Sequence, residues 1–201
     1  ADIQGGSKYA PRYISFRNYS GTELDYEIAN LDTSNVTYMG AMFSYCQKLT
    51  TLDLSSFNTS NVTKTGNMFS YCNRLANLDL TSFYTSKVTD MSGMFNTCQS
   101  LTTLDLTSFD TSNVTTMSEM FMSCFNLVTL DLTSFDTSKV TNMNSMFYNC
   151  SLLGNIPILN ASKVTYVSSF ANNCTSLTDF GGLENLGQAY STTYSANYYN
   201  Y

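Results

Sequence analysis

The 201-residue chain contains no histidine and no tryptophan, and only two prolines. Without histidine, no imidazole can serve as a general base or as a metal ligand. The sequence also has no glycine-rich loop of the kind that cradles phosphate groups. These absences remove the commonest enzyme designs, so we expect no catalytic activity and no cofactor.

Charge is scarce as well: charged residues make up 12% of the chain, and 15 acidic residues outnumber 9 basic ones for a net charge of -6. Nucleic acids and anionic lipids attract basic surfaces, so neither is an expected partner. No apolar run reaches the ~20 residues of a membrane-spanning helix, so we expect no membrane insertion in this segment. The start shows neither an initiator Met nor a signal-peptide pattern, so either a leader has been removed or the sequence is an excerpt of a longer protein. The tail from Tyr190 to Tyr201 has no obvious closing element, which favours the excerpt.

Repetition is what the sequence has in abundance. Residues 101–114 return almost letter for letter 26 residues later, and the same text also begins at Leu49 and Leu75. A fixed period of this length is typical of a solenoid, in which each repeat buries its apolar face only against its neighbours. We therefore predict that equivalent residues of successive repeats lie directly above one another.

Each repeat has two halves with different apolar periods. The first half follows Leu49-x-x-Leu52-x-Leu54, and its alternation predicts a short strand. The second half has apolar residues every three or four positions from Val88 to Leu101, which predicts an α-helix or a 3₁₀-helix. Strands are expected near 24–28, 50–54, 76–80, 102–106, 128–132, 154–158 and 178–183, and helical stripes from Val36, Val62, Val88, Val114, Val140 and Val164. Candidate helix N-caps are Ser60, Ser86, Ser112 and Ser138.

These halves predict an α/β repeat: a right-handed solenoid with a narrow parallel sheet on one face and short helices or 3₁₀ turns on the other. We expect a single domain over residues 1–201. Residues 1–35 would form an N-terminal cap and an atypical first turn, and 36–177 the repeats. Residues 178–201 would form a C-terminal cap or begin a further module.

The unit reads Met-Phe-x-x-Cys-x-x-Leu-x-x-Leu-Asp-Leu-(Ser/Thr)-Ser-Phe-(Asp/Asn)-Thr-Ser-x-Val-Thr, and its Leu-x-x-Leu-x-Leu core is the leucine-rich repeat signature. Over residues 24–183 the chain resembles the BspA-like leucine-rich repeats of bacterial surface proteins. The resemblance implies an extracellular or cell-surface location and adhesion to a host protein or glycan.

One cysteine occurs in each repeat. Stacked equivalents about 5 Å apart point the same way, which is the wrong geometry for a disulfide, and no Cys-x-x-Cys pair suggests a metal site. We predict a column of buried, reduced thiols: Cys46, Cys72, Cys98, Cys124, Cys150 and Cys174. Beside it we predict a buried Met ladder (Met42, Met68, Met94, Met120, Met146) and a Phe spine (Phe43, Phe69, Phe95, Phe121, Phe147, Phe170).

The outward positions of the strand half form the predicted ligand-binding site, which we name the Thr/Asp face. Its middle carboxylates form the Asp row, which Glu27 would extend. Like charges at this spacing repel one another, so selection for stability alone is not expected to assemble them. The face consists of Thr51, Asp53, Ser55, Asn77, Asp79, Thr81, Thr103, Asp105, Thr107, Thr129, Asp131 and Thr133, and the Asp row of Asp53, Asp79, Asp105 and Asp131.

Three interpretations of the Asp row are open. In the first, each carboxylate bonds to a neighbouring hydroxyl while solvent screens the repulsion. In the second, the row recognises a partner's cations, amides or sugar hydroxyls. The third is calcium binding, although one Asp per repeat supplies few of the six to eight oxygens that calcium takes. Like-charge crowding further predicts raised pKa values for the inner pair, Asp79 and Asp105.

A column of threonines follows the Val of each repeat: Thr37, Thr63, Thr89, Thr115, Thr141 and Thr165. Threonine ladders on flat solenoids occur in ice-binding proteins. At the start of a predicted helix, however, the hydroxyl is expected to bond to a backbone group instead.

Equivalent carboxylates on an open face do not form the acid–base pair that a glycosidase needs in a cleft. We therefore predict a non-catalytic binding module that presents its polar, acidic repeat face to a partner. The alternative is a structural component of a surface filament, a surface layer or a phage particle. Such a component would self-associate through end-to-end or lateral contacts, because exposed sheet edges invite pairing.

Overall fold

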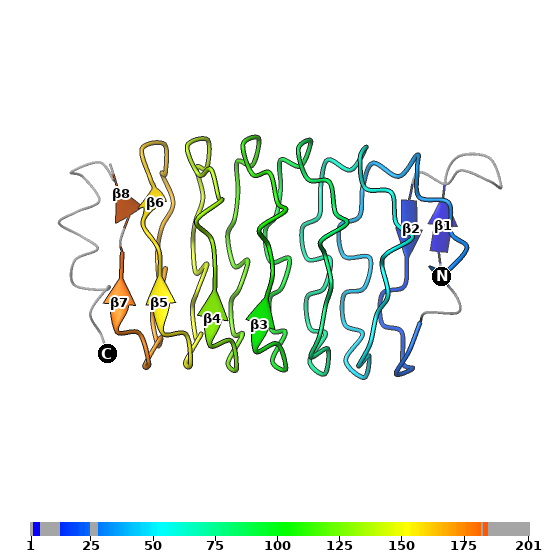
Figure 1. Cartoon of the computed structure of the whole chain (residues 1–201), viewed down its shortest axis with the longest axis horizontal. Helices are drawn as coiled ribbons and strands as arrows, with labels where there is room; N and C mark the ends of the chain where they lie inside the picture. Colours follow the sequence, from blue (N-terminus) through cyan, green and yellow to red (C-terminus); the bar gives the residue numbers. More distant parts are fainter. Residues whose placement is uncertain (1, 5–12, 25–27, 182, 185–201) are drawn as a thin grey trace.

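The computed structural model describes residues 2–4, 13–24, 28–181 and 183–184. The chain winds in successive coils along one long axis, so that each coil is one repeat of the sequence (Figure 1). Residues one period apart are hydrogen-bonded neighbours, as when the hydroxyl of Thr63 donates to the carbonyl of Thr37 26 residues earlier. The predicted solenoid is confirmed.

One side of the coils carries short parallel strands. β3 (Thr103–Leu104) pairs with β4 (Thr129–Leu130), and β5 (Asn155–Ile156) pairs with β7 (Asp179–Phe180). Their arrows lie side by side and point the same way (Figure 1). All four fall inside predicted strand segments, whereas 50–54 and 76–80 contain no strand, and 24–28 lies partly outside the described residues.

The opposite side, which we name the turn side, is not helical, so the predicted helices or 3₁₀ turns over the described repeats are wrong. Between Met39 and Cys46 the chain forms three overlapping β-turns, closed by Met42 N donating to Met39 O (3.3 Å), Ser44 N to Ala41 O (3.1 Å) and Cys46 N to Phe43 O (3.2 Å). The third residues of the first and last turns, Ala41 and Tyr45, have positive φ values of 55° and 62°. Positive φ at this position defines a type II turn and interrupts a helix.

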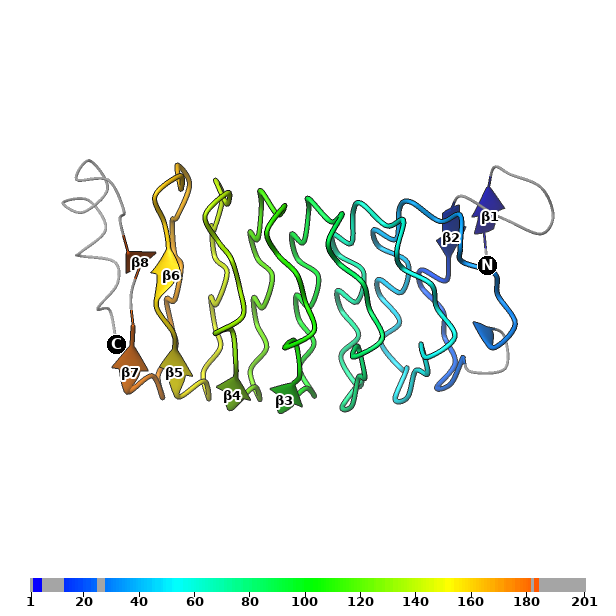
Figure 2. The ribbon, with the colours of Figure 1, turned by 45° about the horizontal axis from the view of Figure 1, so that its top comes forward.

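Backbone groups on the turn side bond to the next coil. The N–H groups of Met39, Ala41, Phe43 and Tyr45 donate to carbonyls of the following coil at 2.8–3.0 Å. A continuous ladder of parallel bridges runs from Tyr13↔Tyr38 to Asn142↔Tyr166. Figure 2 shows the turn side and the strand side as two layers of each coil.

Three of the four serines expected at helix N-caps, Ser60, Ser112 and Ser138, have a different role. The N–H of Ser60 donates to Asn58 Oδ1 (3.1 Å), and the N–H of Ser112 donates to Asp110 Oδ1 (3.0 Å). These are Asx-turns, in which the preceding Asp or Asn side chain accepts the bond and no helix follows.

At the N-terminal end, β1 (Asp2–Gln4) pairs antiparallel with β2 (Tyr13–Ser15). Phe16 follows β2 and stacks on Phe43 at 5.6 Å, so regular coil packing begins inside the segment predicted as a cap. At the other end, β6 (Leu159–Asn160) pairs with β8 (Leu183–Glu184). Most of the predicted C-terminal cap, 178–201, lies outside the described residues.

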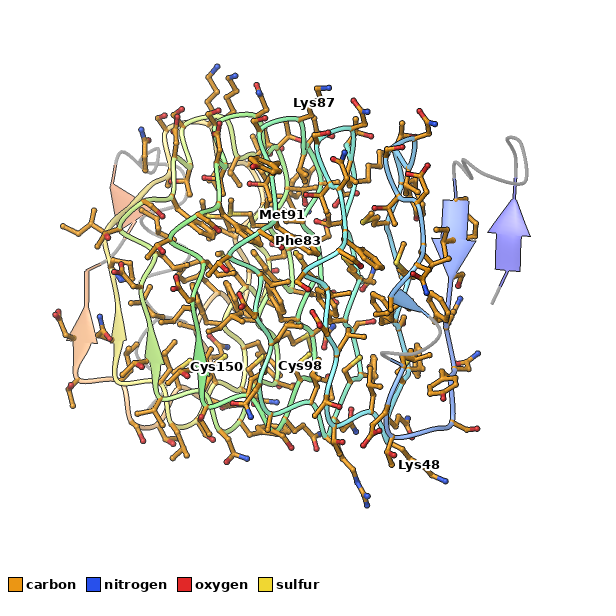
Figure 3. All side chains as sticks on the ribbon, turned by 45° about the vertical axis from the view of Figure 1, so that its right-hand side comes forward. Lys48, Phe83, Lys87, Met91, Cys98 and Cys150 are labelled. Carbon is orange, nitrogen blue, oxygen red and sulfur yellow. The ribbon has the colours of Figure 1, made fainter. Side chains whose placement is uncertain are left out.

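The interior consists of the predicted columns. Rings of the Phe spine stack nearly parallel at 5.5–5.8 Å from Phe43 to Phe147, and Phe170 meets Phe147 edge-on at 5.3 Å. The Met ladder is fully buried. In Figure 3, Cys98 and Cys150 lie among the interior side chains, whereas Lys48 and Lys87 project from opposite edges.

The six cysteines are free and buried, as predicted. Each thiol from Cys72 onward donates to the carbonyl oxygen of the Phe in the preceding coil, at 3.0–3.1 Å. Burial raises the pKa of Cys124 to about 12 and that of Cys174 to about 11. The thiols of Cys124 and Cys174 therefore stay protonated at neutral pH.

Candidate functional site

The strand half places the Thr/Asp face on the surface. Leu104 and Leu130 point into the core, so their neighbours Asp105 and Asp131 must point outward, because side chains alternate along a strand. The register Thr103↔Thr129 aligns equivalent residues of neighbouring coils. All twelve predicted site residues are exposed, whereas Glu27 lies outside the described residues.

Each inner aspartate bonds to the Thr two residues later. Asp79 Oδ1 accepts from the N–H and the hydroxyl of Thr81 at 2.9 and 2.7 Å, and Asp105 Oδ1 accepts the same pair from Thr107 at 3.0 and 2.7 Å. Asp131 repeats the arrangement with Thr133. The first of the three interpretations, bonding of each Asp to a neighbouring hydroxyl, therefore describes the geometry.

These bonds decide the protonation state of the Asp row. The hydroxyl and the N–H of Thr81 lower the pKa of Asp79, and their effect exceeds the opposing repulsion from Asp105 and Asp53. Thr107 lowers the pKa of Asp105 in the same way. The predicted rise in the pKa values of Asp79 and Asp105 is wrong, because full hydration weakens the repulsion between neighbours while each local donor lies in direct contact. The Asp row is ionised at neutral pH.

The bonds also orient the carboxylates. Both donors of Thr81 converge on Oδ1 of Asp79, and those of Thr107 converge on Oδ1 of Asp105. Among the described residues, no group donates a hydrogen bond to Oδ2 of either aspartate. Asp79 and Asp105 therefore each present one oriented anionic oxygen that a partner can contact.

The Thr/Asp face has two concave parts. The larger is an open hollow of about 560 Å³ over β3 and β4, lined by Asp105, Asp131 and the threonines beside them, with Asn155 and Pro157 at its far end. The smaller, about 90 Å³, lies between Asp53 and Asp79. Each of these hollows contains a pair of neighbouring aspartates.

The turn-side threonines bond to the backbone, as predicted. Each hydroxyl from Thr63 to Thr165 donates to the carbonyl of the Thr one coil earlier, at 3.0–3.3 Å. The expected location at a helix start is wrong, but the expected backbone partner is confirmed.

Sequence reasoning missed one group of surface residues, which we name the apolar corner: Phe125, Val128 and Leu152. These side chains are exposed, and Val128 directly precedes β4. The sequence did contain a signal, namely apolar residues at positions that are polar in another repeat. In the coil that contains Cys98, which we count as the third, the equivalent residues are Gln99, Thr102 and Ser100.

Within the described residues, no three His, Cys, Asp or Glu side chains come close enough together to hold a metal ion. The same part of the chain contains no helix with the length and hydropathy of a membrane span.

The stacked coils, the parallel strands and the Leu-x-x-Leu-x-Leu core together define a leucine-rich repeat solenoid. A family model described as "Mycoplasma protein of unknown function, DUF285" matches residues 15–83 and 72–181, so the chain belongs to this family. No curated protein matches the chain.

Solved structures of bacterial leucine-rich repeat proteins share the fold. The T. pallidum leucine-rich repeat protein is 17% identical, with 86% of this chain and 80% of that chain covered and a TM-score of 0.50. A leucine rich cell surface protein from Faecalibacterium prausnitzii is 20% identical, with 87% and 48% covered and a TM-score of 0.52. The chain thus spans about half of the Faecalibacterium protein, and at these identities the likeness concerns the fold.

Proposed function

We propose that the chain is a non-catalytic binding module that presents the Thr/Asp face to a host protein or glycan at the cell surface. The observation that carries this proposal is the Asp row: exposed carboxylates, held ionised and oriented by bonds such as those from Thr81 to Asp79. A surface-protein role is also supported by the fold, which is shared with a protein described as a leucine rich cell surface protein.

Rigid display favours binding for a physical reason. Side chains that are already ordered lose little conformational entropy when a partner arrives, so more of the contact energy appears as affinity. The carboxylates of the Asp row suit a partner's cations, amides or sugar hydroxyls, and the neighbouring threonine hydroxyls both donate and accept.

Charge reversal on the Asp row tests the proposal. The double variant Asp79→Lys/Asp105→Lys should lose binding on an array of glycans and extracellular-matrix proteins, while its melting curve stays close to that of the parent. Asp110→Lys/Asp136→Lys is a matched control, because these exposed aspartates also accept bonds from a residue two positions later but lie outside the Thr/Asp face. Parent-like array binding by the Asp79/Asp105 variant would refute the site.

The same array also tests calcium. If the Asp row recognises its partner directly, binding should persist in a chelator. Binding that requires added calcium would instead support the metal interpretation of the row.

Assembly between solenoids is the second candidate function. End-to-end assembly would pair the backbone edges of terminal strands such as β7 and β8, whose described partners are β5 and β6. Sedimentation velocity distinguishes the two candidates: a concentration-independent monomer favours binding to another molecule, and growing end-to-end species favour assembly.

A further inference from the structure

We propose that the apolar corner and the hollow over β3 and β4 together bind an extended polypeptide segment that carries a Lys or Arg near an apolar side chain. This inference rests on the proposed function, because Asp105 and Asp131 belong to the Thr/Asp face. It adds a partner class and a second contact region.

The apolar corner departs from the repeat where the repeat is otherwise polar. Phe125, Val128 and Leu152 are 37%, 46% and 45% exposed. Their equivalents in the third coil, Gln99, Thr102 and Ser100, show that the fold accepts polar residues at all three positions. The apolar side chains are therefore not required by coil packing, and grouped exposed apolar residues mark interaction sites.

Backbone bonds bring the three residues to one place. Ser151 Oγ donates to the carbonyl of Phe125 (3.2 Å), and Gly154 N donates to the carbonyl of Val128 (3.2 Å). Residues 125–128 and 151–154 therefore run side by side on neighbouring coils. Gly154 contributes no side chain next to Val128, which leaves the apolar surface uncovered on that side.

The hollow begins where the apolar corner ends. Thr129, which follows Val128, lines it, and Asp131 stands two residues further along the coil. A strand rises about 3.3 Å per residue, so the corner and the carboxylates are separated by about three residues of extended chain. One short segment can therefore reach both regions.

Charge complementarity identifies the occupant. Asp105 and Asp131 are ionised and fully hydrated, so a guanidinium or ammonium group can bind between them without being buried. Val128 and Leu152 favour an aliphatic side chain. A neutral glycan supplies neither group, whereas a peptide with a basic and an apolar residue about three positions apart supplies both.

Labelled synthetic peptides of about eight residues are the probe, because an extended chain of that length spans both the apolar corner and the carboxylates of the hollow. One set pairs Arg with Leu at the stated spacing, a second replaces Leu by Ser, and a third replaces Arg by Glu. Fluorescence anisotropy with the full chain should show binding by the first set alone, weakened by added salt because the ionic contact is exposed.

The triple variant Phe125→Gln/Val128→Thr/Leu152→Ser copies the third coil and should fold with an unchanged melting curve. Its affinity for the Arg–Leu peptides should fall by about tenfold or more, the effect expected when apolar anchors are removed from an interface. Gln99→Ala/Thr102→Ala is the matched control, because it alters the equivalent corner two coils from Leu152, and it should bind like the parent.

Several outcomes would overturn the inference. Parent-like peptide binding by the triple variant would exclude the apolar corner. If the Asp79→Lys/Asp105→Lys variant still loses its array partner in that case, the proposed function survives alone. Equal binding of the Arg–Leu and Glu–Leu peptides would exclude the ionic contact, and binding of glycans alone would exclude a polypeptide. A parent that sediments as a dimer while the triple variant is monomeric would assign the corner to self-association.

Discussion

At the residue scale, a short pattern determines how each carboxylate of the Asp row behaves. An aspartate followed two positions later by Ser or Thr accepts that residue's N–H, and Asp105, for example, also accepts the hydroxyl of Thr107. The donors lie within hydrogen-bond distance, whereas neighbouring carboxylates interact through water. The local bonds therefore dominate, and they lower the pKa values.

The hydroxyl of Thr81 is the first cause of the lowered pKa of Asp79. We expect an NMR titration to place the pKa of Asp79 below the ordinary value of about 3.9, and Thr81→Val to raise it toward that value. The stabilisation linked to a lowered carboxyl pKa is complete above about pH 4 and is lost as pH falls through the folded-state pKa. A wild-type pKa above the ordinary value would contradict this account.

At the element scale, the coils are held together by columns that continue from one repeat to the next. Phe95 stacks on Phe69 and Phe121 at 5.8 and 5.7 Å, and Cys98 donates to the carbonyl of Phe69. Each contact joins two different coils, so each coil is stabilised by both of its neighbours.

Removing one ring from the Phe spine should leave a cavity shared by three coils. We expect Phe95→Ala to lower the free energy of unfolding by about 3–5 kcal/mol, measured by chemical denaturation. Tyr84 is exposed, and other coils carry Asp at its position. Tyr84→Asp should therefore change the free energy of unfolding by no more than about 0.5 kcal/mol. Similar effects of the two substitutions would show that the spine is not close-packed.

The buried thiols should make the folded protein sensitive to base. Burial raises the pKa of Cys124 to about 12, so the stabilisation from keeping it neutral is complete below the ordinary thiol pKa of about 8.5 and declines as pH rises from there through the folded value. We expect the melting temperature to fall above about pH 9 and native thiols to react slowly with a disulfide reagent. Fast labelling of Cys124 in the native state would contradict its burial.

At the scale of the whole molecule, the stability is approximately the sum of contributions from equivalent coils and from the contacts between neighbouring coils. Deleting residues 75–100, one full period, should join Arg74 to Leu101 in register and keep a cooperative, less stable fold. Deleting about half a period should place strand residues over turn residues and abolish folding, because the ladders join residues 26 apart, or 24 apart at the last coil. Circular dichroism and thermal melts measure both outcomes, and equal stability of the two deletions would exclude the stacking account.

The conformation of the turn side was not predictable from apolar spacing. Intervals of three and four between Met39, Met42, Phe43 and Cys46 fit a helix and also fit a series of β-turns. A weaker signal was present, because the positive-φ positions of other coils include Asn67 and Gly93, and Asn and Gly adopt that conformation most readily.

Which residues stack follows from the repeats alone, because a period of 26 residues, two shorter at the last coil, allows only one register in which Leu, Phe, Met and Cys meet their own kind in the core. The sequence thereby also determined that the Thr/Asp face points to solvent. Only the tertiary structure decided where the backbone hydrogen bonds of the turn side go, since their partners lie in the next coil and not four residues away. It also decided that two departures from the repeat, near Val128 and near Leu152, meet at one corner, because that proximity exists only between coils.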